Sequence, residues 1–138
     1  MDTVPASITR GLALELLDAN GTATPLAAEL RYDTSDPYAV AACFLAGETE
    51  VQWVFARDLL KAGIHQPTGD GDVHIWPCLD AQGHAATIIE LSSPDGEALI
   101  QARTDELYDF LAEAETLVRS GSEGDFVDVE SALLNLLA

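Results

Sequence analysis

Residues 8–32 read ITRGLALELLDANGTATPLAAELRY, two runs of alternating side chains on either side of a turn. Every second position in both runs is apolar except Arg10, as expected for strands that bury one face. The apolar positions are Ile8, Leu12, Leu14 and Leu16 in the first run and Leu26, Ala28, Leu30 and Tyr32 in the second. Asp18-Ala19-Asn20-Gly21 between them is typical of a hairpin turn. The stretch therefore predicts two antiparallel strands.

Further strands are predicted on both sides of a short helix. They cover residues 38–45 and 50–55 before the helix, and 73–79, 84–92 and 97–102 after it. The alanines of 38–45 also favour a helix, but the run is short, lies between turns and contains aromatic and β-branched residues, so we predict a strand. The helix covers 56–62, has strong helix formers, and is expected to stop at Gly63.

Two features interrupt the second group of strands. Residues 66–72 are rich in glycine, proline and aspartate and are predicted to form a loop. Pro77 has no backbone N–H to donate, so the strand over 73–79 is expected to lie at an edge of the sheet or to contain a bulge.

From Thr104 onward the apolar period changes from 2 to about 3.6, which predicts a long amphipathic helix. Its apolar stripe is Leu107, Phe110, Leu111, Ala114, Leu117 and Val118. Acidic residues in the first turn and Arg119 near the end suit the helix dipole. The predicted class is α+β with antiparallel sheets, in the order four strands, helix, three strands, helix.

A short C-terminal helix follows a flexible break at 120–124. Asp128 is a suitable N-cap, and Leu133, Leu136 and Leu137 lie on one side of the expected helix. We therefore predict one domain over 1–120 and an acidic, amphipathic tail over 121–138. The tail either packs on its own domain or binds a partner, so these three leucines are candidate contact residues.

The charge restricts the partners of the chain. Its 138 residues carry 24 Asp and Glu against 6 Lys and Arg, a formal charge of −18. Such a chain lacks the counterion release that supplies most nucleic-acid affinity, and anionic lipids repel it. Any membrane contact is expected to be indirect, through a partner protein. The N-terminus lacks the basic and apolar blocks of a signal peptide, so a cytoplasmic location is expected.

No catalytic or metal-binding pattern is evident. The soft ligands are His65, His74, His84, Cys43 and Cys78, and none forms the close pairs of zinc sites. His74 and His84 are expected to contact each other across neighbouring strands. A Gly-x-Ser-x-Gly elbow and a phosphate-binding glycine loop are both missing. We therefore predict no enzyme activity, no cofactor and no metal.

Three aromatic residues are the remaining candidates for contact with a partner or a second copy. Tyr38, Trp53 and Trp76 are large and amphipathic, although core packing is the more common role of such residues. The two cysteines each lie in an apolar run, which favours buried thiols over a disulfide.

Four stretches resemble the SsgA-like proteins, a family of sporulation and cell-division proteins of filamentous actinomycetes. They are ELRYDTSDPYAV at 29–40, WVFARDLL at 53–60, PTGDGDV at 67–73 with Trp76-Pro77, and LSSPDGEAL at 91–99. Their order and spacing cover most of the chain from about Leu26 onward. Together they are specific, whereas each one alone is a weak signal.

The resemblance implies a non-enzymatic function. Within the family the chain is most similar to the member that recruits the tubulin-like division protein FtsZ to future septa and helps to tether its ring to the membrane. The resemblance also implies a whirly-like fold, a homotrimer, an SsgA-type activator protein as a second partner, and a location at the division septum. Whirly proteins bind single-stranded nucleic acid, which is the alternative function, but they use basic grooves and this chain is acidic.

Overall fold

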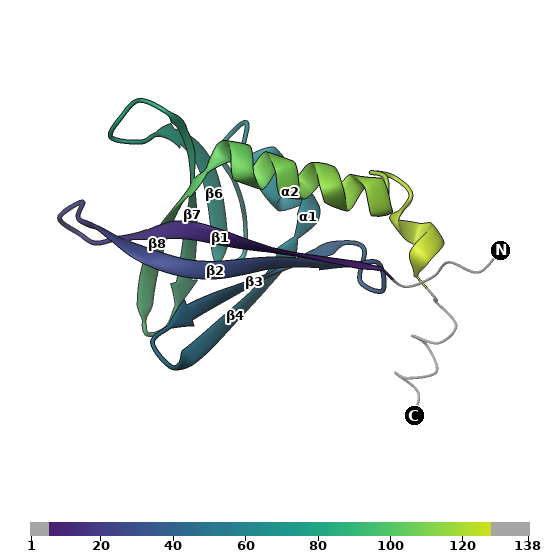
Figure 1. Ribbon diagram of the computed structural model, residues 1–138, viewed down its shortest axis with the longest axis horizontal. Helices are drawn as coiled ribbons and strands as arrows, with labels where there is room; N and C mark the ends of the chain where they lie inside the picture. The colour runs from purple at the N-terminus through teal and green to yellow at the C-terminus, as the bar shows by residue number, and fades with distance from the viewer. Residues whose placement is uncertain (1–5, 128–138) are drawn as a thin grey trace.

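The structure, a computed structural model, describes residues 6–127 and contains one antiparallel sheet of eight strands with two α-helices (Figure 1). The strands are β1 (Ser7–Leu17), β2 (Ala23–Asp33), β3 (Ala39–Ala46), β4 (Thr49–Ala56), β5 (Thr68–Asp70), β6 (Val73–Leu79), β7 (Ala85–Ser93) and β8 (Gly96–Arg103). The helices are α1 (Arg57–Gly63), α2 (Thr104–Leu117) and a 3₁₀ turn, η1 (Glu123–Phe126). The strand order is β4-β3-β2-β1-β8-β7-β6-β5. The predicted α+β class is confirmed.

The hairpin predicted from residues 8–32 is present as β1 and β2, whose register runs from Ser7 opposite Asp33 to Leu17 opposite Ala23. Leu12 and Leu14 are buried, as the alternation predicts. Arg10, which interrupts the apolar face, forms an ion pair with Glu113 of α2. The charge is tolerated on this face because the helix brings a carboxylate to it.

The predicted loop over 66–72 is partly wrong, because residues 68–70 form β5 and pair with β6. Four strands therefore follow α1, and all eight join into one sheet. Gly69 leaves room for the imidazole ring of His74 in its present position: a Cβ there would lie 2.2 Å from Cδ2, so a larger residue would require the half-exposed ring to move. Pro77 lies beyond the last pairing of β6 with β5, on the open edge of β6, as its missing N–H predicts.

Helix α2 buries most of the predicted stripe against the sheet, which curls around it (Figure 1). The helix ends at Leu117, which is half-buried, so Val118 and Arg119 lie just beyond it. Leu107, Phe110, Leu111, Ala114 and Val118 all lie in the core. Helix α1 ends at Gly63 as expected, but without the left-handed backbone of a glycine cap, because the C-cap residue Ile64 is itself right-handed. Gly63 is required for a different reason: a Cβ there would lie 2.3 Å from Cγ2 of the buried Ile75.

Residues 121–127 pack on the domain, where Glu123 is buried and Phe126 contacts the core. The helix predicted after Asp128, with Leu133, Leu136 and Leu137, lies outside the described residues. None of the helices between residues 6 and 127 has the length and hydropathy needed to cross a membrane.

Candidate functional site

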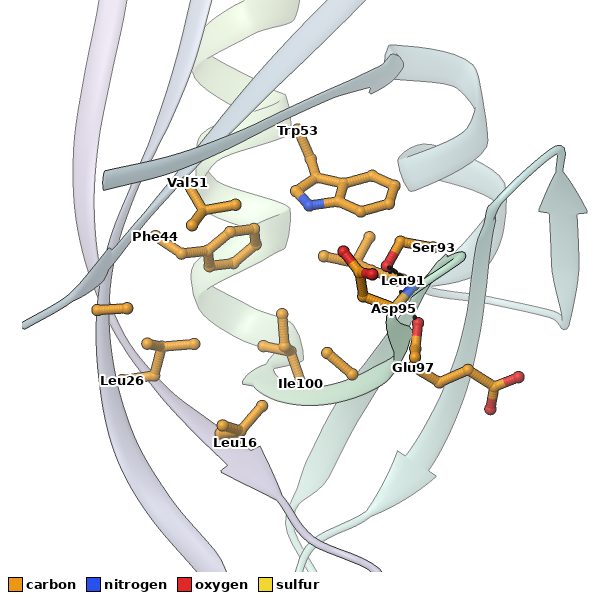
Figure 2. Close-up of a pocket in the computed structure, with 13 residues that line it drawn as sticks. Leu16, Leu26, Phe44, Val51, Trp53, Leu91, Ser93, Asp95, Glu97 and Ile100 are labelled. Atoms are coloured by element: carbon orange, nitrogen blue, oxygen red, sulfur yellow. Dashed lines mark hydrogen bonds between the residues drawn. The ribbon is translucent and has the colours of Figure 1, made fainter. Parts of the chain in front are cut away.

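An apolar cleft opens at the end of the fold where the hairpin turns β3–β4 and β7–β8 face each other across the curled sheet (Figure 2). Its cavity volume is about 340 Å³. We call it the hairpin cleft and define it by the residues Leu16, Leu26, Phe44, Val51, Trp53, Leu91, Ile100, Asp95 and Glu97. Cavities of roughly 300–1,000 Å³ with an apolar lining are typical of binding sites.

The cleft is open because α2 covers only part of this face. The ion pair between Glu113 and Arg10 places α2 over the first half of β1. Along β1, Leu12 and Leu14 are buried, whereas Leu16 on the same face is 38% exposed. Side chains that alternation assigns to one buried face thus become exposed beyond the helix.

Strand β4 shows the same change. Phe55 is buried, Trp53 is half-buried, and Val51 is 41% exposed, although the three share one face of the strand. In Figure 2 the side chains of Phe44, Trp53 and Ile100 point into the opening. The exposed apolar area is therefore continuous across the ends of several strands, which is the form of surface that binds other molecules.

The rim of the cleft is acidic. Asp95 and Glu97 come from the β7–β8 hairpin, and neither has an ion-pair partner within residues 6–127. Their lining neighbours include no Lys or Arg. The backbone N–H of Asp95 donates to the hydroxyl of Ser93 at 3.3 Å, which orders the turn. The arrangement has an apolar floor and carboxylates without counterions at its edge.

The three aromatic residues that the sequence analysis named as candidate contacts lie at different places in the structure. Trp53 lines the hairpin cleft. Trp76 lies in a separate, shallow surface hollow with His74 and Glu90. Tyr38, immediately before β3, is 53% exposed and lines neither of these two sites. Of the three, only Trp53 belongs to the cleft.

The predicted contact between His74 and His84 is wrong. The β6–β7 register places His74 opposite Glu90, with 3.5 Å between Nδ1 and Oε1. His84 lies in the turn before β7, where its backbone N–H donates to the Asp80 carboxylate at 2.9 Å. That hydrogen bond is the main cause of the lowered pKa of Asp80. Each histidine therefore lies next to an acid instead of the other histidine: His74 next to Glu90 across the two strands, and His84 next to Asp80 in the turn.

The described part of the chain, residues 6–127, contains no group of three or more His, Cys, Asp or Glu side chains arranged to hold a metal ion. Both cysteines are free: Cys43 is buried, as predicted, and Cys78 is half-buried. Burial raises the pKa of both thiols, which keeps them protonated and weakly nucleophilic.

Sequence reasoning missed a buried cation. Arg57, the first residue of α1, is 1% exposed and donates from Nη1 to the carbonyl of Val118 at 2.7 Å and to the Tyr32 hydroxyl at 3.1 Å. Its Nη2 donates to Glu123 at 2.9 Å. The guanidinium carbon also lies 5.2 Å from the centre of the Tyr32 ring. Arg57 therefore joins β2, the end of α2 and η1.

Acid is expected to weaken the contact of η1 with the domain. The pKa of Glu123 is lowered from its ordinary value of 4.5, first by its own backbone N–H and further by Gly121 and Arg57. A lowered pKa in the folded state stabilises the fold above the ordinary value, and this contribution is lost as the pH falls through the lowered value. The measurement is denaturant unfolding of the wild type and Glu123→Gln between neutral and acidic pH.

The stability difference between the two proteins should shrink below about pH 4.5, the ordinary glutamate pKa. Asp125→Asn is the matched control, because Asp125 lies in the same turn and is exposed. A difference for Glu123→Gln that stays constant across this pH range would contradict the prediction.

The chain is similar to proteins of bacterial sporulation. The family described as Streptomyces sporulation and cell division protein, SsgA, matches residues 26–123. The sporulation-specific cell division protein SsgB of Streptomyces coelicolor is 46% identical over 128 residues, which cover 92% of this chain and 93% of that protein. The protein of the same name from Saccharopolyspora erythraea is 47% identical over 124 residues, which cover 89% of this chain and 86% of that protein.

A solved structure has the same fold. The crystal structure of an SsgA-like sporulation-specific cell division protein from Thermobifida fusca superposes with a TM-score of 0.87 and 39% sequence identity, over 98% of each chain. The curled sheet with its two helices is therefore shared with this relative.

Proposed function

Because this chain belongs to the SsgA family of sporulation and cell division proteins, we propose that it recruits FtsZ to future septum sites and helps to tether and organise the FtsZ ring. The chain acts in this proposal as an adaptor without catalytic activity. The family membership carries the proposal, and the hairpin cleft supports it, since an open apolar surface with an acidic rim suits contact with another protein.

Assembly would strengthen a weak contact. We propose a homotrimer at the septum that presents several copies of one FtsZ-binding surface, so that binding to a filament of repeated subunits gains avidity. An SsgA-type activator protein is the second proposed partner. The charge of −18 argues for an indirect membrane attachment through a protein, because anionic lipids repel such a surface.

The proposal predicts that the intact chain sediments with FtsZ polymers assembled with GTP and stays in the supernatant without them. A chain that ends after Val127 tests whether the C-terminal segment takes part. This end point keeps every described residue, including Glu123, which forms an ion pair with Arg57. Loss of sedimentation only in the shortened chain would place the contact on residues 128–138, whereas no sedimentation of the intact chain would contradict the proposal.

The alternative function, single-stranded nucleic-acid binding, is tested with a labelled oligonucleotide at low salt. Five of the six Lys and Arg residues form ion pairs with carboxylates of this chain, namely Arg10, Arg31, Arg57, Lys61 and Arg103. Phosphate would have to compete with these carboxylates, so we expect no rise in fluorescence anisotropy. Binding that weakens steeply with salt would favour the alternative.

A further inference from the structure

We propose that the hairpin cleft binds a short apolar segment of a partner protein, and that this segment carries lysine or arginine beside its apolar residues. The inference rests on the proposed function, since it specifies the chemistry of the segment through which a protein partner is held.

The floor of the cleft requires an apolar occupant. Leu16 and Val51 are 38% and 41% exposed, and Trp53 is half-buried, although each lies on the strand face that forms the core elsewhere. Removing apolar surface from water is favourable, so covering these side chains favours binding. The ring of Phe44 and the side chain of Ile100 complete the floor (Figure 2).

The rim determines the charge of the occupant. In Figure 2 the Asp95 side chain points into the opening and the Glu97 side chain points away from it, so an occupant meets one carboxylate inside the cleft and one outside. Neither is in an ion pair within the described residues, and the cleft is lined by no cation. A basic residue at the end of an apolar segment therefore supplies the counterion that the fold itself lacks.

The C-terminal segment of the same chain does not meet these requirements. Residues 128–138 carry Asp128 and Glu130 but no Lys or Arg. They follow η1, where Gly124 lies beside the Tyr38 hydroxyl at the start of β3, whereas the cleft lies at the other end of that strand. The C-terminal segment therefore offers no cation to the acidic rim.

A second copy of the chain is also an unsuitable occupant. Five of its six Lys and Arg residues already form ion pairs with its own carboxylates, so a second copy has little basic charge to offer the acidic rim. A basic segment of a different protein gains from the two rim carboxylates. Charge complementarity thus selects a partner segment of opposite sign.

The test uses the full chain with Trp76→Phe, which leaves Trp53 as the only tryptophan of the protein. Two synthetic peptides share a centre of leucine and isoleucine, and one has lysines at both ends whereas the other has glutamates. The lysine peptide should shift the Trp53 emission to shorter wavelengths with a saturable curve that weakens with salt. The glutamate peptide should bind at least about tenfold more weakly.

Val51→Asp and Val54→Asp are matched variants on opposite faces of β4. Val51 lines the cleft, whereas Val54 is 56% exposed on the other face. Val51→Asp should lower the affinity for the lysine peptide at least about tenfold, and Val54→Asp should leave this affinity unchanged. The double variant Asp95→Asn with Glu97→Gln should remove the preference for the lysine peptide over the glutamate peptide. Both positions lie on an exposed hairpin, so this variant provides a second test if Val51→Asp does not fold.

The inference would be overturned by equal affinity for the two peptides, by no binding of either, or by equal effects of the two β4 variants. Sedimentation that shows self-association lost only in Val51→Asp would instead assign the cleft to a second copy and also overturn it. The proposed function is judged separately. If Val51→Asp still sediments with FtsZ as the wild type does, the cleft is wrong as the FtsZ contact while recruitment stands.

Discussion

Replacing Arg57 with methionine should cost roughly 3–5 kcal/mol of folding free energy, since breaking a buried ion pair leaves a charge without its partner. Methionine keeps an unbranched apolar stem but lacks the guanidinium group, so it removes the hydrogen bonds to Val118, Tyr32 and Glu123. Urea unfolding followed by fluorescence measures the loss. Because domains are stable by only about 5–15 kcal/mol, this is a large fraction of the total.

Lys61→Met is the matched control for Arg57→Met. Lys61 lies on the same helix and binds Glu115 at 2.6 Å, but its side chain is 47% exposed. Exposed ion pairs contribute about 0–1 kcal/mol, so the control should lose little. Arg57→Lys should fall between the two, because it keeps the charge and loses the planar fork. Equal losses in Arg57→Met and Lys61→Met would show that the Arg57 cluster does not support the fold.

Gly63→Ala should destabilise the protein by roughly 1–3 kcal/mol or more, as expected for overpacking a filled core. In an open helix the same change would gain up to about 1 kcal/mol from helix propensity, so the sign of the effect is diagnostic. The added Cβ would lie 2.3 Å from Cγ2 and 2.5 Å from Cβ of Ile75, which is fully buried. A β-branched side chain in the core cannot move away.

Thermal unfolding of Gly63→Ala, Ile75→Ala and the double variant measures this contact. The double variant should lose less stability than the sum of the single variants, because the smaller residue 75 makes room for the new methyl group. Gly69→Ala is the control: its Cβ would lie 2.2 Å from the His74 ring, which is half-exposed and can rotate away. An increase in stability for Gly63→Ala would contradict the packing argument.

Two departures from the sequence prediction have separate physical causes. Strand β5 was missed because residues 66–72 contain turn residues, and three residues are too few for an alternation to be visible. The contact between His74 and His84 was wrong because the turn at 80–84 decides the register, and the two histidines are not opposite each other in that register.

The candidate site was predicted only in part. The sequence singled out Trp53 as a contact, and it lies in the hairpin cleft. It also singled out Trp76 and Tyr38, which lie elsewhere. Nothing in the alternation distinguishes Leu16 from Leu14, since both occupy the same face of β1. The acidic composition was visible in the sequence, but the sequence did not show which carboxylates lack an ion-pair partner.

The strands, their apolar faces and the long helix follow from local periodicity, because the backbone of a strand places residues two apart on one side and that of a helix repeats every 3.6 residues. How far α2 reaches along the sheet is a property of the assembled fold. It depends on where β8 ends, how the sheet curls and where Glu113 meets Arg10. That reach buries Leu14, exposes Leu16 and leaves the cleft open. Likewise, the burial of Arg57 requires residues more than 60 positions apart to meet.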